Sequence, residues 1–167
     1  MPMRPLPMRP FWLAAVAAFA VDQASKAIVV HAMDLRNRLS MEVLPPLLNF
    51  RMGWNEGINF GLFAGSHEVM RWLLIGLAVG VSVALAAWAR GLARPVARVA
   101  AGLVVGGALA NALDRVLYGA VADFLNVSWW GIDNPFAFNL ADVFIFAGAA
   151  GLILWGDRPA PDRAETP

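Results

Sequence analysis

Two aspartates, Asp123 and Asp142, flank the last hydrophobic segment of the chain. A carboxylate beside or inside an apolar span is costly in lipid, so it requires a partner, a water-filled cavity or a function. Two carboxylates held close together tend to share one proton, which supplies an acid and a base from a single residue type. This pair therefore predicts acid–base chemistry on a substrate that lies in the bilayer.

The composition indicates an integral membrane protein. Of the 167 residues, 59% are hydrophobic and 15% are charged, whereas a soluble domain is about 45–50% apolar and about 25% charged. The net charge of +1 and the lack of a basic run argue against nucleic-acid binding. The chain has no cysteine, which excludes disulfides and thiolate chemistry. The two histidines, His31 and His67, fall in predicted loops, so we expect no metal and no cofactor.

The apolar residues gather into four blocks, each close to the roughly 20 residues that a membrane-spanning helix needs. We predict an all-α integral membrane protein with four transmembrane helices, forming one membrane domain over residues 1–167. The spans are expected at about 11–30, 72–88, 96–117 and 138–155. The proline-containing tail at about 157–167 is expected to be disordered.

The arginines predict the orientation of these spans. Arg4 and Arg9 precede the first span, and Arg90, Arg94 and Arg98 surround the short connection between the second and third, in both places without an acidic residue. Positive charge favours the cytoplasmic side. We therefore expect both termini in the cytoplasm and the segments at about 31–70 and 118–137 outside, which in a bacterium is the outer side of the cytoplasmic (inner) membrane.

The first outer segment mixes aromatic residues with glycines, a pattern typical of short strands with tight turns. We expect it to form a small β-cradle or lid on the membrane surface. At the N-terminus, Ala18-Phe19-Ala20 is similar to the cleavage site of a secretory signal. The apolar run resumes at Ala27-Ile28-Val29-Val30, which favours an uncleaved span.

Other polar residues lie near the outward ends of the spans. They form three groups: Asp22 with Lys26, Asn111 with Asp114 and Arg115, and Asn139 with Asp142. The members of each group share a helix face or lie next to it. The charged groups could be pairs that only neutralise each other, and the asparagines could be interhelical hydrogen bonds. With those cations matched by Asp22 and Asp114, at least one of Asp123 and Asp142 lacks a dedicated counter-charge.

Five segments, in this order and in these places relative to the spans, resemble the bacterial lipoprotein signal peptidases, the type II signal peptidases. They are Asp22-Gln23-Ala24-Ser25-Lys26, Asn55-Glu56-Gly57-Ile58-Asn59-Phe60-Gly61, residues 106–115, residues 119–124 and residues 136–142. Two departures from the family are Ala110, where glycine is usual, and the larger pair Ile58-Asn59.

The resemblance implies an aspartic endopeptidase whose catalytic pair is Asp123 and Asp142. It implies supporting or substrate-binding roles for Asp22, Lys26, Asn55, Gly57, Asn111, Asp114, Arg115 and Asn139. The implied substrate is a prolipoprotein with a diacylglyceryl-modified cysteine, which is cut just before that cysteine at the outer face of the membrane. We expect a monomer surrounded by membrane lipids. Which aspartate is the acid and which is the base stays open.

Three alternatives remain. Ser25 and Lys26 could form a serine–lysine dyad, although neighbouring residues on a helix point in different directions. A small proton-coupled carrier would need polar residues reaching both faces, and the inward halves of the spans carry little beyond Ser82. A membrane chaperone that binds lipid or peptide would keep its function when either aspartate becomes asparagine, whereas a protease would not.

Overall fold

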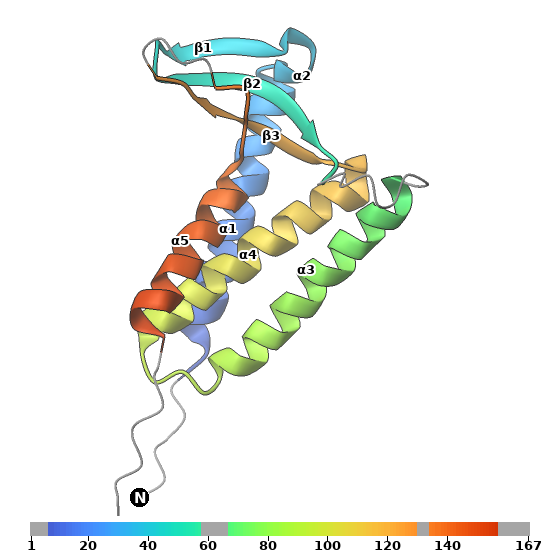
Figure 1. Ribbon diagram of the computed structural model, residues 1–167. Helices are drawn as coiled ribbons and strands as arrows, with labels where there is room; N and C mark the ends of the chain where they lie inside the picture. The colour runs from blue at the N-terminus through green and yellow to red at the C-terminus, as the bar shows by residue number, and fades with distance from the viewer. Residues whose placement is uncertain (1–6, 58–66, 130–133, 157–167) are drawn as a thin grey trace, which may run out of the picture.

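The computed structural model describes residues 7–57, 67–129 and 134–156. Four long helices form a bundle, and a small sheet covers one end of it (Figure 1). The helices are α1 (Arg9–Lys26), which continues as the π-helix η1 (Ala27–Ala32), α3 (His67–Ala89), α4 (Pro95–Tyr118) and α5 (Leu140–Trp155). The short helix α2 (Leu35–Arg38) leads from η1 into the sheet. The start of α1 and the end of α5 lie at the other end of the bundle.

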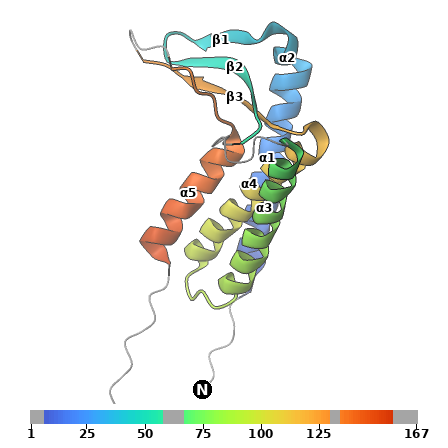
Figure 2. The same cartoon turned by 45° about the vertical axis from the view of Figure 1, so that its right-hand side comes forward.

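Helix α4 is the centre of the bundle, because it contacts α1, α3 and α5 (Figure 2). Glycines make these contacts close. A Cβ atom on Gly102 or Gly106 would overlap backbone atoms of α1, and one on Gly107 would lie 2.5 Å from the carbonyl oxygen of Ala141 in α5. The departure at Ala110 is accommodated as a fully buried methyl group. Small residues therefore bring together the helices that carry the polar groups.

Replacing Gly106 with alanine should lower the free energy of unfolding by about 1–3 kcal/mol, because the added methyl group overlaps the carbonyl of Ala15 and the side chain of Ala18. Gly76→Ala in α3 is the matched control, since a Cβ atom there meets nothing within 4 Å. Alanine is the better helix former, so the control should be unchanged or more stable by up to about 1 kcal/mol. Thermal unfolding in detergent measures both; equal effects would contradict the packing argument.

The structure places a helix on each of the four predicted spans. By length and composition, three helices among the described residues are able to cross a membrane: Arg9–Ala32, His67–Ala89 and Pro95–Tyr118. The fourth, α5, has 16 residues, about 24 Å at 1.5 Å per residue. It begins at Leu140 rather than at the predicted residue 138, because Asn139 is its N-cap.

The sheet is antiparallel, with strands β1 (Ser40–Leu44), β2 (Leu48–Asn55) and β3 (Val121–Val127) in that spatial order. The first two strands come from the outer segment in which strands were predicted. The third strand was not predicted, and it places Asp123 opposite Gly53 of β2. Phe138 then pairs with Leu125, so the chain that enters α5 is held beside β3.

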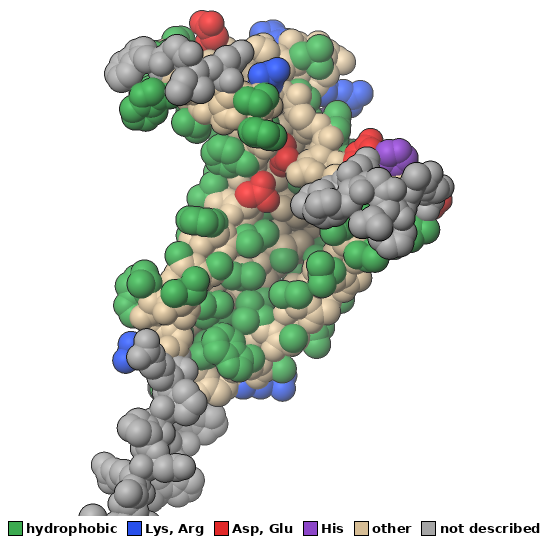
Figure 3. Space-filling view, viewed as in Figure 1, with side chains coloured by type: hydrophobic (Ala, Val, Ile, Leu, Met, Phe, Trp, Pro, Cys, Tyr) green, Lys and Arg blue, Asp and Glu red, His purple; other side chains and the backbone are tan. Residues whose placement is uncertain are grey.

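Hydrophobic side chains cover the helices, and acidic side chains gather where the bundle meets the sheet (Figure 3). Exposure on α5 reaches 78% for Phe146 and 84% for Ile153. Basic side chains lie at the far end of the bundle and also over the sheet. An apolar belt between two polar ends is the distribution expected of helices that face lipid.

Two sequence expectations need correction, and two others fall outside the described residues. His31 lies in η1 and His67 is the first residue of α3, so neither is in a loop. The end of the bundle away from the sheet, predicted to hold little that is polar beyond Ser82, also holds a buried cation: Arg98 is 2% exposed and donates to the carbonyls of Pro7 and Leu92 at 3.1 and 2.6 Å. The predicted disordered tail and the pair Ile58-Asn59 lie outside the described residues.

Candidate active site

The polar residues of four elements meet at the junction of the sheet and the bundle. Asp123 comes from β3, Asn55 from the end of β2, Asn111 from α4, and Asn139 with Asp142 from the start of α5. Hydrogen bonds join them into one chain, which runs from Asn55 to Asp123, Asn139, Asn111 and Asp142. The structure thus brings together the two aspartates that lie 19 residues apart in the sequence (142 minus 123).

Asn139 and Asp142 are fixed by a capping box at the first turn of α5. The Asn139 side-chain oxygen accepts from the Asp142 backbone N–H at 3.0 Å, and the Asp142 carboxylate accepts from the Asn139 backbone N–H at 3.3 Å. Such reciprocal bonds satisfy two free donors at the beginning of a helix. The three-residue spacing therefore sets the orientation of both side chains.

Asp123 is 4% exposed and accepts two amide hydrogen bonds, from Asn139 Nδ2 at 2.6 Å and from Asn55 Nδ2 at 3.0 Å. Burial, and to a smaller extent the neighbouring Asp142 carboxylate, raises the pKa of Asp123 to about 6, although the two amides and the Lys26 charge act in the opposite direction. Desolvation disfavours the charged carboxylate. Asp123 therefore holds a proton more readily than an ordinary aspartate does.

Asp142 is only half-buried. Its Oδ1 accepts from Asn111 Nδ2 at 2.9 Å. The oxygen of that Asn111 amide accepts in turn from Asn139 Nδ2 and from the Lys26 ammonium, each at 3.2 Å. Asn111 thus links the two carboxylates to each other and to a buried cation.

Lys26 is the only lysine of the chain, and it is 5% exposed between two buried carboxylates. Its Nζ lies 2.7 Å from Asp22 Oδ2 and 2.7 Å from Asp114 Oδ2. The pairing of Asp22 with Lys26 is as predicted. Asp114, for which a pair with Arg115 was an open alternative, instead forms its ion pair with Lys26, because adjacent residues on a helix point to different sides and Asp114 faces α1.

Asp22 and Asp114 also bind the backbone next to the two candidate catalytic aspartates. Asp22 accepts from the backbone N–H of Ala141 at 2.8 Å, next to Asp142, and Asp114 accepts from the backbone N–H of Ala122 at 3.2 Å, next to Asp123. Gln23 donates to Asp114 at 2.9 Å. Sequence analysis did not select Gln23, because a glutamine beside a charged pair carries no distinctive signal. This cluster fixes the backbone at both aspartates.

Two further predicted residues border the site. Arg115 donates to the carbonyl of Asn111 at 3.3 Å and is close enough to Asp123, Asp114 and Asp142 to interact with their charges. Gly57 has a φ of +100°, which favours glycine, and its N–H donates to the Asn55 side-chain oxygen at 2.9 Å. That bond leaves the Asn55 amide nitrogen to donate to Asp123.

The geometry is unfavourable for a serine–lysine dyad. The Ser25 hydroxyl donates to the backbone carbonyl of Asp22 at 2.7 Å, while Lys26 is held by Asp22, Asp114 and Asn111. A lysine base must be neutral and bonded to the serine that it activates. Lys26 instead pairs with two carboxylates.

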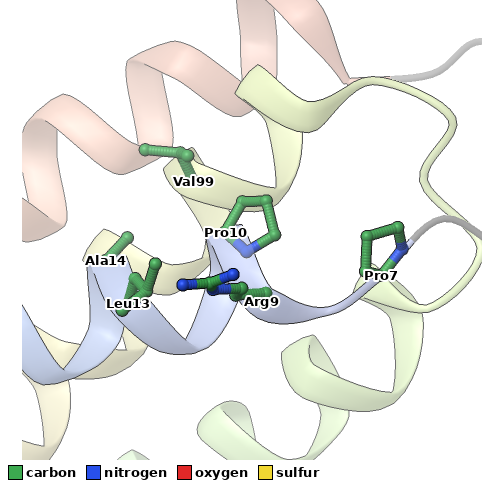
Figure 4. A pocket seen from close by; sticks show the side chains of 6 residues that line it. All are labelled: Pro7, Arg9, Pro10, Leu13, Ala14 and Val99. Atoms are coloured by element: carbon green, nitrogen blue, oxygen red, sulfur yellow. The ribbon is translucent and has the colours of Figure 1, made fainter.

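A cavity of about 560 Å³ lies at the other end of the bundle, between the start of α1 and Val99 of α4 (Figure 4). Its lining is apolar except for one cation: Pro7, Arg9, Pro10, Leu13, Ala14 and Val99. None of these six residues is an acid or a base that could activate water. Over residues 7–57, 67–129 and 134–156, no group of three His, Cys, Asp or Glu side chains is placed to hold a metal ion.

Comparison with known proteins identifies related proteins of one family. The model of the family described as Signal peptidase (SPase) II matches residues 14–156. Lipoprotein signal peptidase of Methylorubrum extorquens (strain PA1) is 40% identical over 159 residues, which cover 92% of this chain and 89% of that protein. The homologue from Methylobacterium sp. (strain 4-46) is 41% identical over 150 residues, 88% and 90% of the two chains. A bacterial membrane enzyme solved in meso at 1.9 Å resolution is 31% identical, with a TM-score of 0.72, and the match covers 89% of this chain and 94% of that one.

Proposed function

The chain belongs to the signal peptidase II family, whose relatives named above are lipoprotein signal peptidases, and on this premise we propose that Asp123 and Asp142 form the aspartic pair with which it removes signal peptides from prolipoproteins. The observation that carries the proposal is the hydrogen-bonded chain in which Asn139 and Asn111 join the two carboxylates. Peptide hydrolysis without a covalent nucleophile needs one group to activate water and another to protonate the substrate.

The unequal environments of the two aspartates divide these roles. Asp123, buried and with its pKa raised to about 6, holds the shared proton and donates it to the scissile carbonyl. Asp142, half-buried at the start of α5, is the carboxylate that takes a proton from water. A buried carboxyl group that holds its proton, next to a second carboxylate, provides an acid and a base at the same pH.

The surrounding residues position this pair. Asn111, Asn139 and Asn55 hold the carboxylate oxygens. Arg115 supplies positive charge beside them, where negative charge develops on the substrate during attack. Preorganised donors and charges of this kind lower the barrier because they need little rearrangement during the reaction.

The fold suits a substrate that is itself anchored in lipid. In this proposal α1, α3, α4 and the shorter α5 all span the bacterial cytoplasmic membrane, with both termini in the cytoplasm and the sheet on the outer face. The substrate is a prolipoprotein that is cut just before its diacylglyceryl-modified cysteine. Its lipid chains would hold the scissile bond at the level of the carboxylates, where the bundle meets the sheet (Figure 3).

The proposal predicts how activity depends on pH. Because the pair needs one proton, kcat/KM should fall as pH rises through about 6, the pKa of Asp123. Asn55 donates to Asp123 Oδ2 and stabilises its charged form. Asn55→Ala removes that bond, so the pKa of Asp123 rises and the falling limb moves to higher pH. The measurement is the pH profile of kcat/KM with a lipidated prolipoprotein.

Asn49→Ala is the control, because Asn49 lies on the same strand as Asn55 but is paired with Asn126, away from Asp123. Its profile should keep the limb near pH 6. A limb that stays in place in Asn55→Ala, or that moves to lower pH, would remove Asp123 from the role of acid. The measured quantity is the pH at which kcat/KM falls, so a variant with generally lower activity can still be compared with wild type.

A further inference from the structure

A polar cavity lies on the opposite side of β2 from the candidate catalytic pair. Side chains alternate along a strand, so Trp54 and Asn55 point to opposite faces. Asn55 reaches Asp123, whereas the Trp54 ring lies 5.6 Å from the ring of Tyr118 at the end of α4. The cavity beside these rings has no part in the proposed hydrolysis.

The outer chamber of this cavity has a volume of about 370 Å³ and is lined by His31, Arg36, Asn37, Trp54 and Tyr118. None of these five side chains can carry a negative charge at neutral pH, and the Arg36 guanidinium is always positive. The Tyr118 hydroxyl lies 3.3 Å from His31 Nε2. The nearby carboxylate of Asp34 accepts from Asn37 Nδ2 at 2.6 Å, so it is directed at the amide. A planar cation with neutral donors around it suits a phosphate group.

An inner chamber continues from the outer one toward the bundle. It shares His31, Trp54 and Tyr118 and ends at Lys26 and Asp114, with a volume of about 80 Å³. This volume holds a few water molecules and is too small for a headgroup. The single Lys26 charge lies between two carboxylates, Asp22 and Asp114, so the inner end has no excess of positive charge and the positive end of the cavity is the outer one, at Arg36.

The cavity lies at the level where two candidate spans end. The first span ends at Ala32, next to His31, and the span formed by α4 ends at Tyr118. Trp54 and Tyr118 are 46% and 48% exposed. Tryptophan and tyrosine at the end of a span are typical of the headgroup region. This position favours a membrane phospholipid over a free anion from solution.

We propose that the outer chamber binds the phosphate headgroup of an anionic phospholipid, with Arg36 as its charged contact and Tyr118, His31 and Asn37 as neutral hydrogen-bonding groups. The site would anchor a lipid beside η1 and α2, where the bundle joins the sheet. Which leaflet supplies the lipid follows from the orientation proposed above, but the binding itself does not depend on the catalytic roles of Asp123 and Asp142.

The test is binding of short-chain phosphatidylglycerol, with phosphatidylcholine as the neutral reference, to the full chain in detergent by titration calorimetry. Wild type should prefer phosphatidylglycerol, and Arg36→Gln should weaken that binding by about tenfold, as for loss of a charge-assisted hydrogen bond. Arg38→Gln is the matched control, because Arg38 is exposed on the same short helix but is not among the residues that line the chamber. Tyr118→Phe, which keeps the ring, should cause a smaller loss.

Equal binding of the two lipids would overturn the proposal. So would an equal loss in Arg36→Gln and Arg38→Gln, because that result indicates only general surface charge. Displacement of the lipid by an equal concentration of inorganic phosphate would show a site for free anions and would also contradict it. Arg36→Gln should leave prolipoprotein cleavage in detergent unchanged, so failure of this inference and failure of the proposed catalytic pair are distinguishable.

Discussion

Replacing Asp142 with asparagine is expected to lower kcat for prolipoprotein cleavage by about a thousandfold or more, because an amide cannot take a proton from water. Asparagine has nearly the same shape, but its single side-chain oxygen can replace only one of the two carboxylate oxygens, which accept from Asn111 and from the backbone N–H of Asn139. The other half of the capping box, in which Asn139 accepts from the backbone N–H of residue 142, does not involve the substituted side chain, so we expect the folded state to persist with a loss of about 1 kcal/mol. The loss should appear in kcat rather than in substrate binding.

The control is Glu42→Gln, the same acid-to-amide change at an exposed position on β1. It should cleave at the wild-type rate. Thermal unfolding of Asp142→Asn in detergent, measured beside the assay, separates lost chemistry from lost fold. An Asp142→Asn protein that is folded and retains a tenth or more of the wild-type kcat would rule out Asp142 as the base.

The second large effect is expected for Lys26→Met. The substitution removes the cation that lies 2.7 Å from both Asp22 and Asp114 and leaves two buried carboxylates without it. Removing one partner from a buried ion pair costs about 3–5 kcal/mol. We therefore expect the free energy of unfolding to fall by at least that amount, and the backbone at Ala122 and Ala141, which these carboxylates hold, to loosen with it.

Chemical unfolding in detergent measures this change, with Arg51→Met as a control that removes an exposed cation from β2. Adding Asp114→Asn to Lys26→Met should recover part of the stability, because one of the uncompensated charges disappears. A loss below about 1 kcal/mol in Lys26→Met, or a further loss in the double variant, would show that the cluster does not hold the site through its charges.

The helices were predictable because hydropathy alone marks long apolar segments. The predicted spans at 72–88 and 96–117 correspond to α3 and α4 within a few residues. The last helix begins two residues later than predicted, at Leu140, because Asn139, which the prediction included in the helix, is its N-cap. The π-helix at Ala27–Ala32 has no distinct sequence pattern, so His31 was expected in a loop.

The site was predictable only in part. The three-residue spacing of Asn139 and Asp142 correctly indicated one helix turn, and the four-residue spacing of Asp22 and Lys26 indicated a pair. Partners from distant elements were not predictable. The contact between Lys26 and Asp114 depends on how α1 packs against α4, and the strand that carries Asp123 is recognisable only from its pairing with β2.

The most direct test of the aspartic pair compares Asp123→Asn with Ser25→Ala in cleavage of a purified diacylglyceryl-modified prolipoprotein, followed by gel shift. An unlipidated form of the same substrate runs in parallel. We expect wild type and Ser25→Ala to cleave only the lipidated form and Asp123→Asn to cleave neither. Undiminished cleavage by Asp123→Asn together with an inactive Ser25→Ala would contradict the aspartic pair and assign the reaction to Ser25.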